Sequence, residues 1–247
     1  MRLPHGERDQ DSIGRGRFAV ILSRPENHEN VGLVARAMKN TGFGDLRLVG
    51  VDALRPEAFR TAVHSETILK KARYYPDLAA ATGSLNVVFA ATARVRSTFA
   101  VQAFAEAIDT LRTFPRESRI GLLFGNERTG LMSEELGAAN YVFSLPQASR
   151  QPSYNLGSAV LLTLFALFSL PTSAPADPEA VPATRAAQDD CIRVVLMKLE
   201  RSGFIQGANR AHVSGMVRSL FGRLALTDRD RKFLMAVFNQ SVERDRT

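Results

Sequence analysis

The chain has 247 residues, 45% of them hydrophobic, which suffices for one large domain or for a medium domain with a small second one. Its net charge of +7 favours an acidic partner such as nucleic acid. A single cysteine excludes an internal disulfide and a cysteine zinc site, and the four histidines lack metal-ligand spacing. We therefore expect no metal.

The beginning of the chain lacks the apolar segment of a secretory signal, and we expect residues 1–17 to be a flexible N-terminal segment. The longest uncharged apolar run, 156–170, is shorter than the roughly 20 residues needed to cross a bilayer. It predicts a buried helix. These features predict a cytoplasmic protein with no membrane contact.

Short apolar runs predict strands at 18–23, 46–50, 85–92, 119–125 and 141–146. Most are apolar throughout, which is typical of strands buried on both faces. Helical patterns lie between them at 31–40, 57–72 and 101–112. This alternation predicts an α/β fold with a parallel sheet covered by helices on both faces, and a ligand site at the carboxyl ends of the strands.

The first predicted helix begins after Asn30, a good N-cap residue, and ends before Gly42. Its predicted core face consists of Val31, Val34, Ala35 and Met38. The opposite side carries Gly32, Arg36 and Lys39. Taken alone, this stretch is compatible with an ordinary amphipathic helix whose basic face is solvated, as well as with a functional role for Arg36.

Two loops at strand ends carry further candidate residues. Gly125, Asn126 and Glu127 follow the strand predicted at 119–125, and a glycine there lets a ligand approach the backbone. Ser153 and Asn155 stand at the start of the most apolar helix, where Ser153 as a simple N-cap is the structural alternative. Neither loop has a Walker A or G-x-S-x-G pattern.

A stretch rich in proline and alanine, residues 171–187, predicts a linker that few contacts cross. It separates a large domain, 18–170, from a basic helical C-terminal extension, 188–247. Residues 191–247 contain 11 Lys and Arg and 5 Asp and Glu, so they carry 11 − 5 = +6 of the total +7. Such a concentration of charge indicates a docking surface, and hydrophobic positions in the extension leave dimer reinforcement open as a second role.

Three segments, "NVGLVARAMKNTGF", "LLFGNERTGL" and "LPQASRQPSYNLGSAVLL", together resemble motifs one, two and three of the SpoU branch of the SPOUT methyltransferases. The resemblance covers residues 18–170. The extension resembles that of the TrmJ-like subgroup. In motif three, Tyr154 stands where leucine is common; we expect it to line a pocket with its backbone, so that the change has little effect.

The resemblance implies S-adenosylmethionine-dependent 2′-O-ribose methylation of RNA, with tRNA position 32 in the anticodon loop as the expected target. Related enzymes modify rRNA or position 34. It also implies a trefoil knot and a homodimer whose site lies at the subunit interface, without a metal. Three alternatives stay open: an rRNA 2′-O-ribose methyltransferase, a catalytically silent RNA-binding protein of the same fold, and an enzyme that methylates a base nitrogen.

The resemblance also implies roles for individual residues. The implied catalytic residues are Arg36, Asn30, Glu127, Ser153 and Asn155. Because arginine is effectively always protonated, we expect Arg36 to stabilise the alkoxide and grip a phosphate rather than act as a literal base. The implied cofactor-binding residues are Ala91, Thr92, Ala93, Gly125, Leu145, Pro146, Tyr154 and Leu156.

Overall fold

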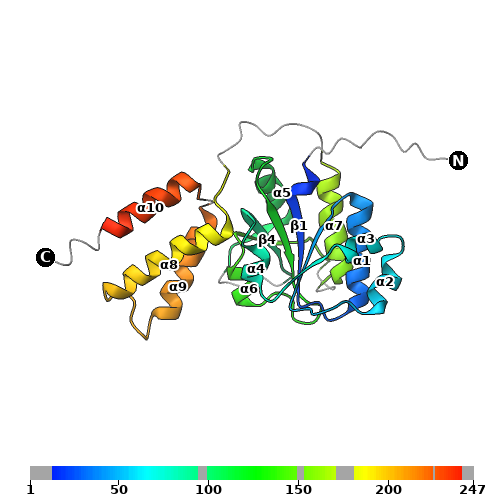
Figure 1. The fold of residues 1–247 in the computed structure, drawn as a ribbon, viewed down its shortest axis with the longest axis horizontal. Helices are drawn as coiled ribbons and strands as arrows, with labels where there is room; N and C mark the ends of the chain where they lie inside the picture. Colours follow the sequence, from blue (N-terminus) through cyan, green and yellow to red (C-terminus); the bar gives the residue numbers. More distant parts are fainter. Residues whose placement is uncertain (1–12, 94–98, 149–152, 171–180, 225, 241–247) are drawn as a thin grey trace.

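A computed structural model describes residues 13–93, 99–148, 153–170, 181–224 and 226–240 (Figure 1). Its centre is a seven-stranded sheet in the order β3-β2-β1-β6-β4-β7-β5, in which every neighbouring pair is parallel. The strands are β1 Phe18–Ser23, β2 Asp45–Val49, β3 Arg73–Tyr75, β4 Val87–Ala91, β5 Val101–Ala103, β6 Ile120–Phe124 and β7 Tyr141–Ser144. The predicted parallel sheet is confirmed, with two short edge strands, β3 and β5, that the sequence patterns do not indicate.

Helices cover both faces of this sheet. One face packs against α1 His28–Thr41, α2 Pro56–Ala62, α3 Glu66–Lys70, α5 Phe104–Thr113 and α7 Leu156–Phe168. The other packs against α4 Leu78–Thr82 and α6 Ser133–Gly137. A short 3-10 helix, Arg15–Arg17, precedes β1. No helix among the described residues is long and apolar enough to cross a membrane.

Strand β1 shows why the sequences of the strands are almost continuously apolar. Its side chains alternate between the two faces: Phe18, Val20 and Leu22 join one core, while Ala19 and Ile21 join the other. All five are at most 1% exposed. Because both faces of the strand are covered by helices, all five of these positions are apolar.

Helix α1 begins earlier than predicted. Its N-cap is Asn27, whose side chain accepts a hydrogen bond from the Glu29 amide at 2.9 Å, so the prediction of Asn30 as the cap is wrong. The C-cap is Gly42, as predicted, with φ 81°. Gly32 is also not on a solvated face: a Cβ there would lie 2.2 Å from the Ala58 carbonyl oxygen, so α1 and α2 pack backbone to backbone.

Two other predicted helices differ from the structure. The helix expected at 57–72 is broken into α2 and α3 at Val63 and His64, which both have positive φ. The first residues of the helix expected at 101–112 form β5, and α5 follows from Phe104. In both places a helical pattern of apolar residues continues across a change of backbone direction, which periodicity alone does not detect.

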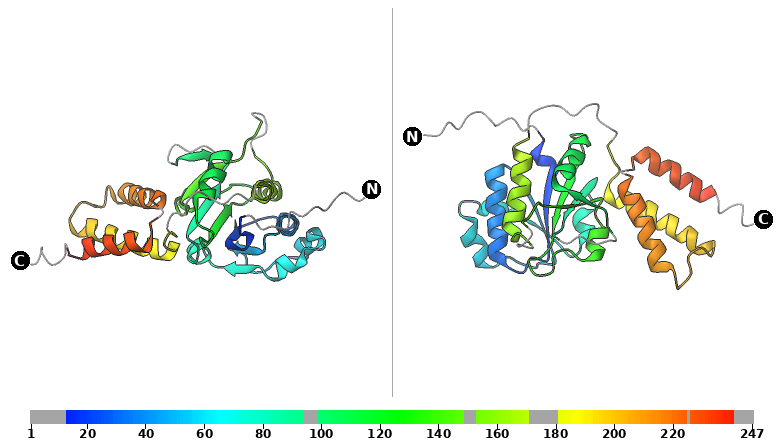
Figure 2. Two further views of the ribbon diagram at one scale, coloured as in Figure 1. Left: turned by 90° about the horizontal axis from the view of Figure 1, so that it is seen from above. Right: turned by 180° about the vertical axis from the view of Figure 1, so that it is seen from behind.

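The C-terminal extension consists of α8 Arg185–Arg201, α9 Arg210–Arg223 and α10 Asp228–Gln240. It lies beside α4 and α6, on the opposite side of the sheet from α1 and α7 (Figures 1 and 2). These helices share their own small core around Cys191, Ile192 and Phe221. The extension is therefore helical, as predicted, with three helices in its described part.

The domain and the extension make more direct contacts than a linker between them would predict. Residues 1–12 and 171–180 lie outside the described residues, but α8 already begins at Arg185, within the segment predicted as linker. Asn86 donates to the Pro182 carbonyl at 2.6 Å, the Arg185 amide donates to the Leu85 carbonyl at 2.7 Å, and Asn140 donates to the Gly222 carbonyl at 2.8 Å. The expectation that few contacts cross this segment is wrong for its last residues.

A charged cluster on the neighbouring strands β2 and β3 has no counterpart in the sequence patterns. Arg47 is fully buried, and it pairs with Asp45 at 2.9 Å and donates to the Ala81 carbonyl at 2.5 Å. Arg73 reaches the same carboxylate at 2.5 Å. Burial alone would raise the pKa of Asp45, but hydrogen bonds from Arg47 and Arg73 outweigh it and hold that pKa below its ordinary value.

Candidate active site

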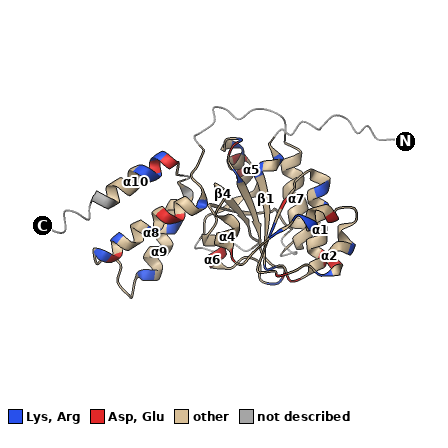
Figure 3. Ribbon diagram, viewed as in Figure 1, with Lys and Arg blue, Asp and Glu red and all other residues tan. Residues whose placement is uncertain are grey.

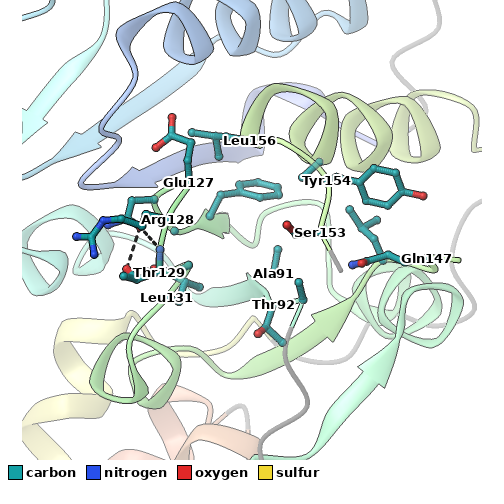
Figure 4. A pocket seen from close by; sticks show the side chains of 17 residues that line it. Ala91, Thr92, Glu127, Arg128, Thr129, Leu131, Gln147, Ser153, Tyr154 and Leu156 are labelled. Atoms are coloured by element: carbon teal, nitrogen blue, oxygen red, sulfur yellow. Dashed lines mark hydrogen bonds between the residues drawn. The ribbon is translucent and has the colours of Figure 1, made fainter. Parts of the chain in front are cut away.

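A pocket opens at the carboxyl ends of β4, β6 and β7, where the parallel sheet predicts a ligand site (Figure 4). Its volume is about 310 Å³. The walls come from the loops after these three strands and from the beginning of α7. The lining residues are Ala91, Thr92, Ala93, Phe124, Gly125, Asn126, Glu127, Arg128, Thr129, Gly130, Leu131, Leu145, Gln147, Ser153, Tyr154, Leu156 and Ala159.

The loop after β6 is folded tightly upon itself. The Asn126 side-chain oxygen accepts from the Thr129 amide at 2.7 Å and from its hydroxyl at 2.9 Å, as the dashed lines in Figure 4 show. A Cβ on Gly125 would lie 2.2 Å from the carbonyl carbon of Gly130 and 2.4 Å from the Leu131 nitrogen. Glycine is thus required here by the closure of the loop on its own backbone, in addition to any ligand.

Glu127 joins this loop to the start of α1. Its carboxylate accepts from the Asn30 side chain at 2.8 Å, and from the backbone amides of Glu26 at 3.0 Å and Asn27 at 3.3 Å. Negative charge is stabilised at this position because the donors lie at the N-terminal end of a helix. The motif-one asparagine and the motif-two glutamate, 97 residues apart in the chain, are therefore held together.

The turn between β1 and α1 is fixed by a second carboxylate. Arg24 has a positive φ of 50°, and its guanidinium donates to Glu135 at 2.8 Å. The same carboxylate accepts from the Ser23 hydroxyl and, at 2.6 Å, from the Met132 amide at the start of α6. A strained backbone conformation is thus held by contacts from a distant helix, and it sets the direction in which α1 leaves the sheet.

Seven of the eight residues predicted to bind the cofactor line this one pocket: Ala91, Thr92, Ala93, Gly125, Leu145, Tyr154 and Leu156. The eighth, Pro146, is exposed and does not line it, although its carbonyl accepts from the Tyr154 hydroxyl at 2.9 Å. Tyr154 lines the pocket and is 41% exposed, and the expectation that it contributes through its backbone stays a prediction.

Of the predicted catalytic residues, Glu127 and Ser153 line the pocket, and Asn30 is bonded to Glu127. Asn155 is the N-cap of α7 and accepts from the Ser158 amide at 2.7 Å, so the cap is not Ser153. Arg36 is exposed on α1 outside the pocket lining. It has no hydrogen-bond or ion-pair partner among the described residues. Within one chain, four of the five predicted catalytic residues thus lie in or beside the pocket, and Arg36 does not.

Several residues of the pocket have no role that the sequence patterns indicate. Asn126 and Thr129 shape the loop, and their spacing beside Gly130 is typical of a tight turn. Arg128 lines the pocket and donates to Glu26 at 3.2 Å, while Gln147 lies on the opposite side (Figure 4). No three histidine, cysteine, aspartate or glutamate side chains cluster as metal ligands in the part of the chain that the structure describes.

Comparisons with known proteins agree with this geometry. A profile of the SpoU rRNA methylase family matches residues 17–165. An uncharacterized tRNA/rRNA methyltransferase of Escherichia coli K12, LasT, is 30% identical, covering 83% of this chain and 97% of its own. The tRNA (cytidine/uridine/adenosine-2′-O-)-methyltransferase TrmJ of Pseudomonas aeruginosa is 26% identical, covering 91% and 93%.

Among solved structures, TrmJ from Z. mobilis ZM4 superimposes with a TM-score of 0.80 at 28% identity. The superposition covers 90% of this chain and 97% of that one, so the likeness includes the C-terminal helices as well as the sheet. The matched profile spans more than half of the residues and reaches into all three motifs. The chain belongs to the SpoU rRNA methylase family.

Proposed function

We propose that this protein transfers a methyl group from S-adenosylmethionine to the ribose 2′-hydroxyl of a tRNA nucleotide, in the anticodon loop at position 32. The observation that carries the proposal is the convergence of motifs two and three on one pocket, with motif one bonded to it through Asn30 and Glu127. Family membership and the tRNA 2′-O-methyltransferases among the relatives support the same reaction.

The pocket residues fit the cofactor. The cavity of about 310 Å³ is lined by small, apolar and polar side chains, with the charged Glu127 and Arg128 among them, and this mixture suits a nucleoside ligand. The residues that would hold it are Ala91 to Ala93, Gly125, Leu145 and Leu156, with Tyr154 contributing through its backbone. When bound, S-adenosylmethionine supplies an electrophilic methyl group attached to a sulfonium.

The chain's own polar residues would prepare the nucleophile. A ribose hydroxyl is a poor nucleophile and must lose its proton as it attacks. Ser153, which lines the pocket, would orient the hydroxyl. Glu127 and Asn30 would hold the start of α1 in place, and Asn155 would fix the start of α7. A charged Arg36 would stabilise the developing alkoxide and bind an RNA phosphate, and solvent water would take the proton that the hydroxyl loses.

We also propose a homodimer that completes the site. Helix α7 is apolar around most of its circumference, and Leu161, Leu162 and Phe165 are each at least 40% exposed on its outer side. Leu33 of α1 is also exposed and lies against Gly157 of α7, so it extends the same apolar surface. A second copy covering this surface would bring Arg36, one turn beyond Leu33, toward the pocket of its partner.

The C-terminal extension would supply the basic surface expected for tRNA, because Lys and Arg residues recur along α8, α9 and α10 (Figure 3). A trefoil knot is part of the proposal, and membership of the SpoU family supports it. We place the protein in the cytoplasm, where its tRNA substrate is found.

A thermal shift tests the cofactor assignment. The demethylated product, S-adenosylhomocysteine, at about 100 times its dissociation constant should stabilise the fold by about 2.7 kcal/mol, because it binds only the native state. For a chain of this size the Tm should rise by roughly 5–11 °C. NAD and ATP are the matched controls. A shift with NAD and none with the product would refute the proposal.

A further inference from the structure

One side of the pocket carries an aromatic ring and an amide that the proposed transfer chemistry does not use. Tyr154 and Gln147 both line the pocket, and Figure 4 places them across Ser153 from Glu127 and Arg128. Tyr154 is 41% exposed. Its hydroxyl donates to the Pro146 carbonyl at 2.9 Å, so the ring is held in one orientation at the rim.

The position of the ring relative to the reacting hydroxyl limits what it can contact. Tyr154 directly follows Ser153, the residue assigned to the ribose. In a nucleotide, the base is attached to the sugar carbon next to the one that carries the 2′-hydroxyl. A ribose held at Ser153 therefore has its base within a few ångströms of that residue, and Tyr154 and Gln147 lie on one side of Ser153 in Figure 4.

The two side chains have complementary properties for binding a base. Exposed aromatic rings stack with unpaired bases in RNA loops, and such stacking tolerates any base because every base has a π-face. The Gln147 amide offers one acceptor and two donors, which suit the hydrogen-bonding edge of a base. It has no hydrogen-bond partner among the described residues, so these groups are not already engaged there.

We propose that Tyr154 and Gln147 form a nucleobase subsite in which Tyr154 stacks on the target base and Gln147 determines which bases are accepted. This inference rests on the proposed function and deepens it. Tyr154 stands where leucine is common in the resembled motif, so the platform is a property of this chain. Base choice is a variable property among relatives: the Pseudomonas aeruginosa enzyme is named for cytidine, uridine and adenosine.

Two other roles for the ring give different results in the same experiment. The ring could serve the adenine of the cofactor, in which case its loss weakens product binding. Alternatively, the hydroxyl could act only as a clamp on the Pro146 loop, in which case removing the hydroxyl alone is as harmful as removing the ring. Tyr154→Phe separates these cases because it retains the ring and loses the bond to Pro146.

The experiment uses the full chain and four tRNA transcripts that differ only in the target base, C, U, A or G. For each transcript we would measure the specificity constant for ribose methylation, and for each protein the calorimetric dissociation constant for S-adenosylhomocysteine. The variants are Tyr154→Leu, Tyr154→Phe and Gln147→Leu. Tyr74→Leu is the matched control, because Tyr74 has a similar exposure of 44% on the edge strand β3 and does not line the pocket.

Tyr154→Leu should lower the specificity constant by roughly five- to 100-fold for all accepted bases, mainly through weaker tRNA binding, with product affinity unchanged. Tyr154→Phe should retain most of the activity. Gln147→Leu should alter the ratio of specificity constants among the four bases by about fivefold or more, since a paired base edge contributes discrimination of that order. Tyr74→Leu should behave as wild type.

A parallel loss of product affinity in Tyr154→Leu would overturn the inference in favour of a cofactor role. Equal losses in Tyr154→Phe and Tyr154→Leu would overturn it in favour of a structural clamp. Unchanged base ratios in Gln147→Leu would remove Gln147 from the subsite. A wild-type protein that methylates no transcript at the ribose would refute the proposed function, and this inference with it.

Discussion

Replacing Gly125 by alanine tests the pocket geometry directly. The new Cβ would lie 2.2 Å from the Gly130 carbonyl carbon, 2.4 Å from the Leu131 nitrogen and 2.5 Å from the Gly130 oxygen. All three are backbone atoms, which a rotamer change cannot move. The loop must therefore shift by about 1 Å to restore van der Waals contact at about 3.5 Å. Overpacking of this kind costs about 1–3 kcal/mol.

The shift would be measured by thermal unfolding and by calorimetric binding of S-adenosylhomocysteine. The Tm of Gly125→Ala should fall by roughly 2–12 °C, and product affinity should fall by about tenfold or more, because Gly130 and Leu131 line the pocket. Gly137→Ala is the matched control: its Cβ would meet no atom within 4 Å. Equal Tm and affinity in the two variants would refute the account of this loop.

Three further changes test other parts of the molecule. Arg36→Ala should abolish methyl transfer and leave Tm and product affinity unchanged, and Arg36→Lys should restore little activity because an ammonium lacks the planar donor fork. Asn140→Ala should lower the unfolding free energy by about 1–3 kcal/mol, measured by urea denaturation, because buried partners in β4 and α9 lose their hydrogen bonds. Asp45→Asn should destabilise the fold by about 3–5 kcal/mol at pH 7, because Arg47 would be buried without a counter-charge.

The pH dependence of the last variant has a definite sign. The folded pKa of Asp45 is lowered, so its contribution is complete above the unfolded value of about 3.9 and is lost as the pH falls through the lower folded value. The stability difference between wild type and Asp45→Asn should therefore narrow below about pH 4. A constant stability difference from pH 7 to pH 3 would contradict the role assigned to Asp45. Full activity of Arg36→Ala would contradict the role assigned to Arg36. An unchanged urea midpoint of Asn140→Ala would contradict the role assigned to Asn140.

The sheet is predictable from the sequence because its strands carry a strong local signal. β1 has the boundaries that its apolar run predicts, since every residue from Phe18 to Ser23 is buried. The predicted N-cap of α1 is wrong by three residues because Asn27 and Asn30 are both good caps, and only a tertiary bond assigns Asn30 to Glu127. The prediction for Gly32 fails for a related reason, because the neighbouring helix that covers it belongs to a distant segment.

Motif resemblance locates most of the pocket, and tertiary contacts supply the rest. Seven predicted residues line it because strand-end loops of a parallel sheet meet at one edge. Gln147 and Arg128 escape prediction because a polar residue in a loop has no distinctive local pattern. The contacts between the domain and the extension are not predicted either. A segment rich in proline and alanine does not indicate that the buried side-chain amides of Asn86 and Asn140 donate hydrogen bonds to it and to α9.

The most direct test of the proposed function is mass spectrometry of the nucleosides and fragments of an unmodified tRNA after incubation with the protein and S-adenosylmethionine. We predict that the wild-type protein adds one methyl group to the ribose of the nucleotide at position 32. The Arg36→Ala variant should add none. Methylation of a base nitrogen, or a tRNA of unchanged mass despite product-dependent stabilisation of the protein, would contradict ribose methylation of tRNA by this chain.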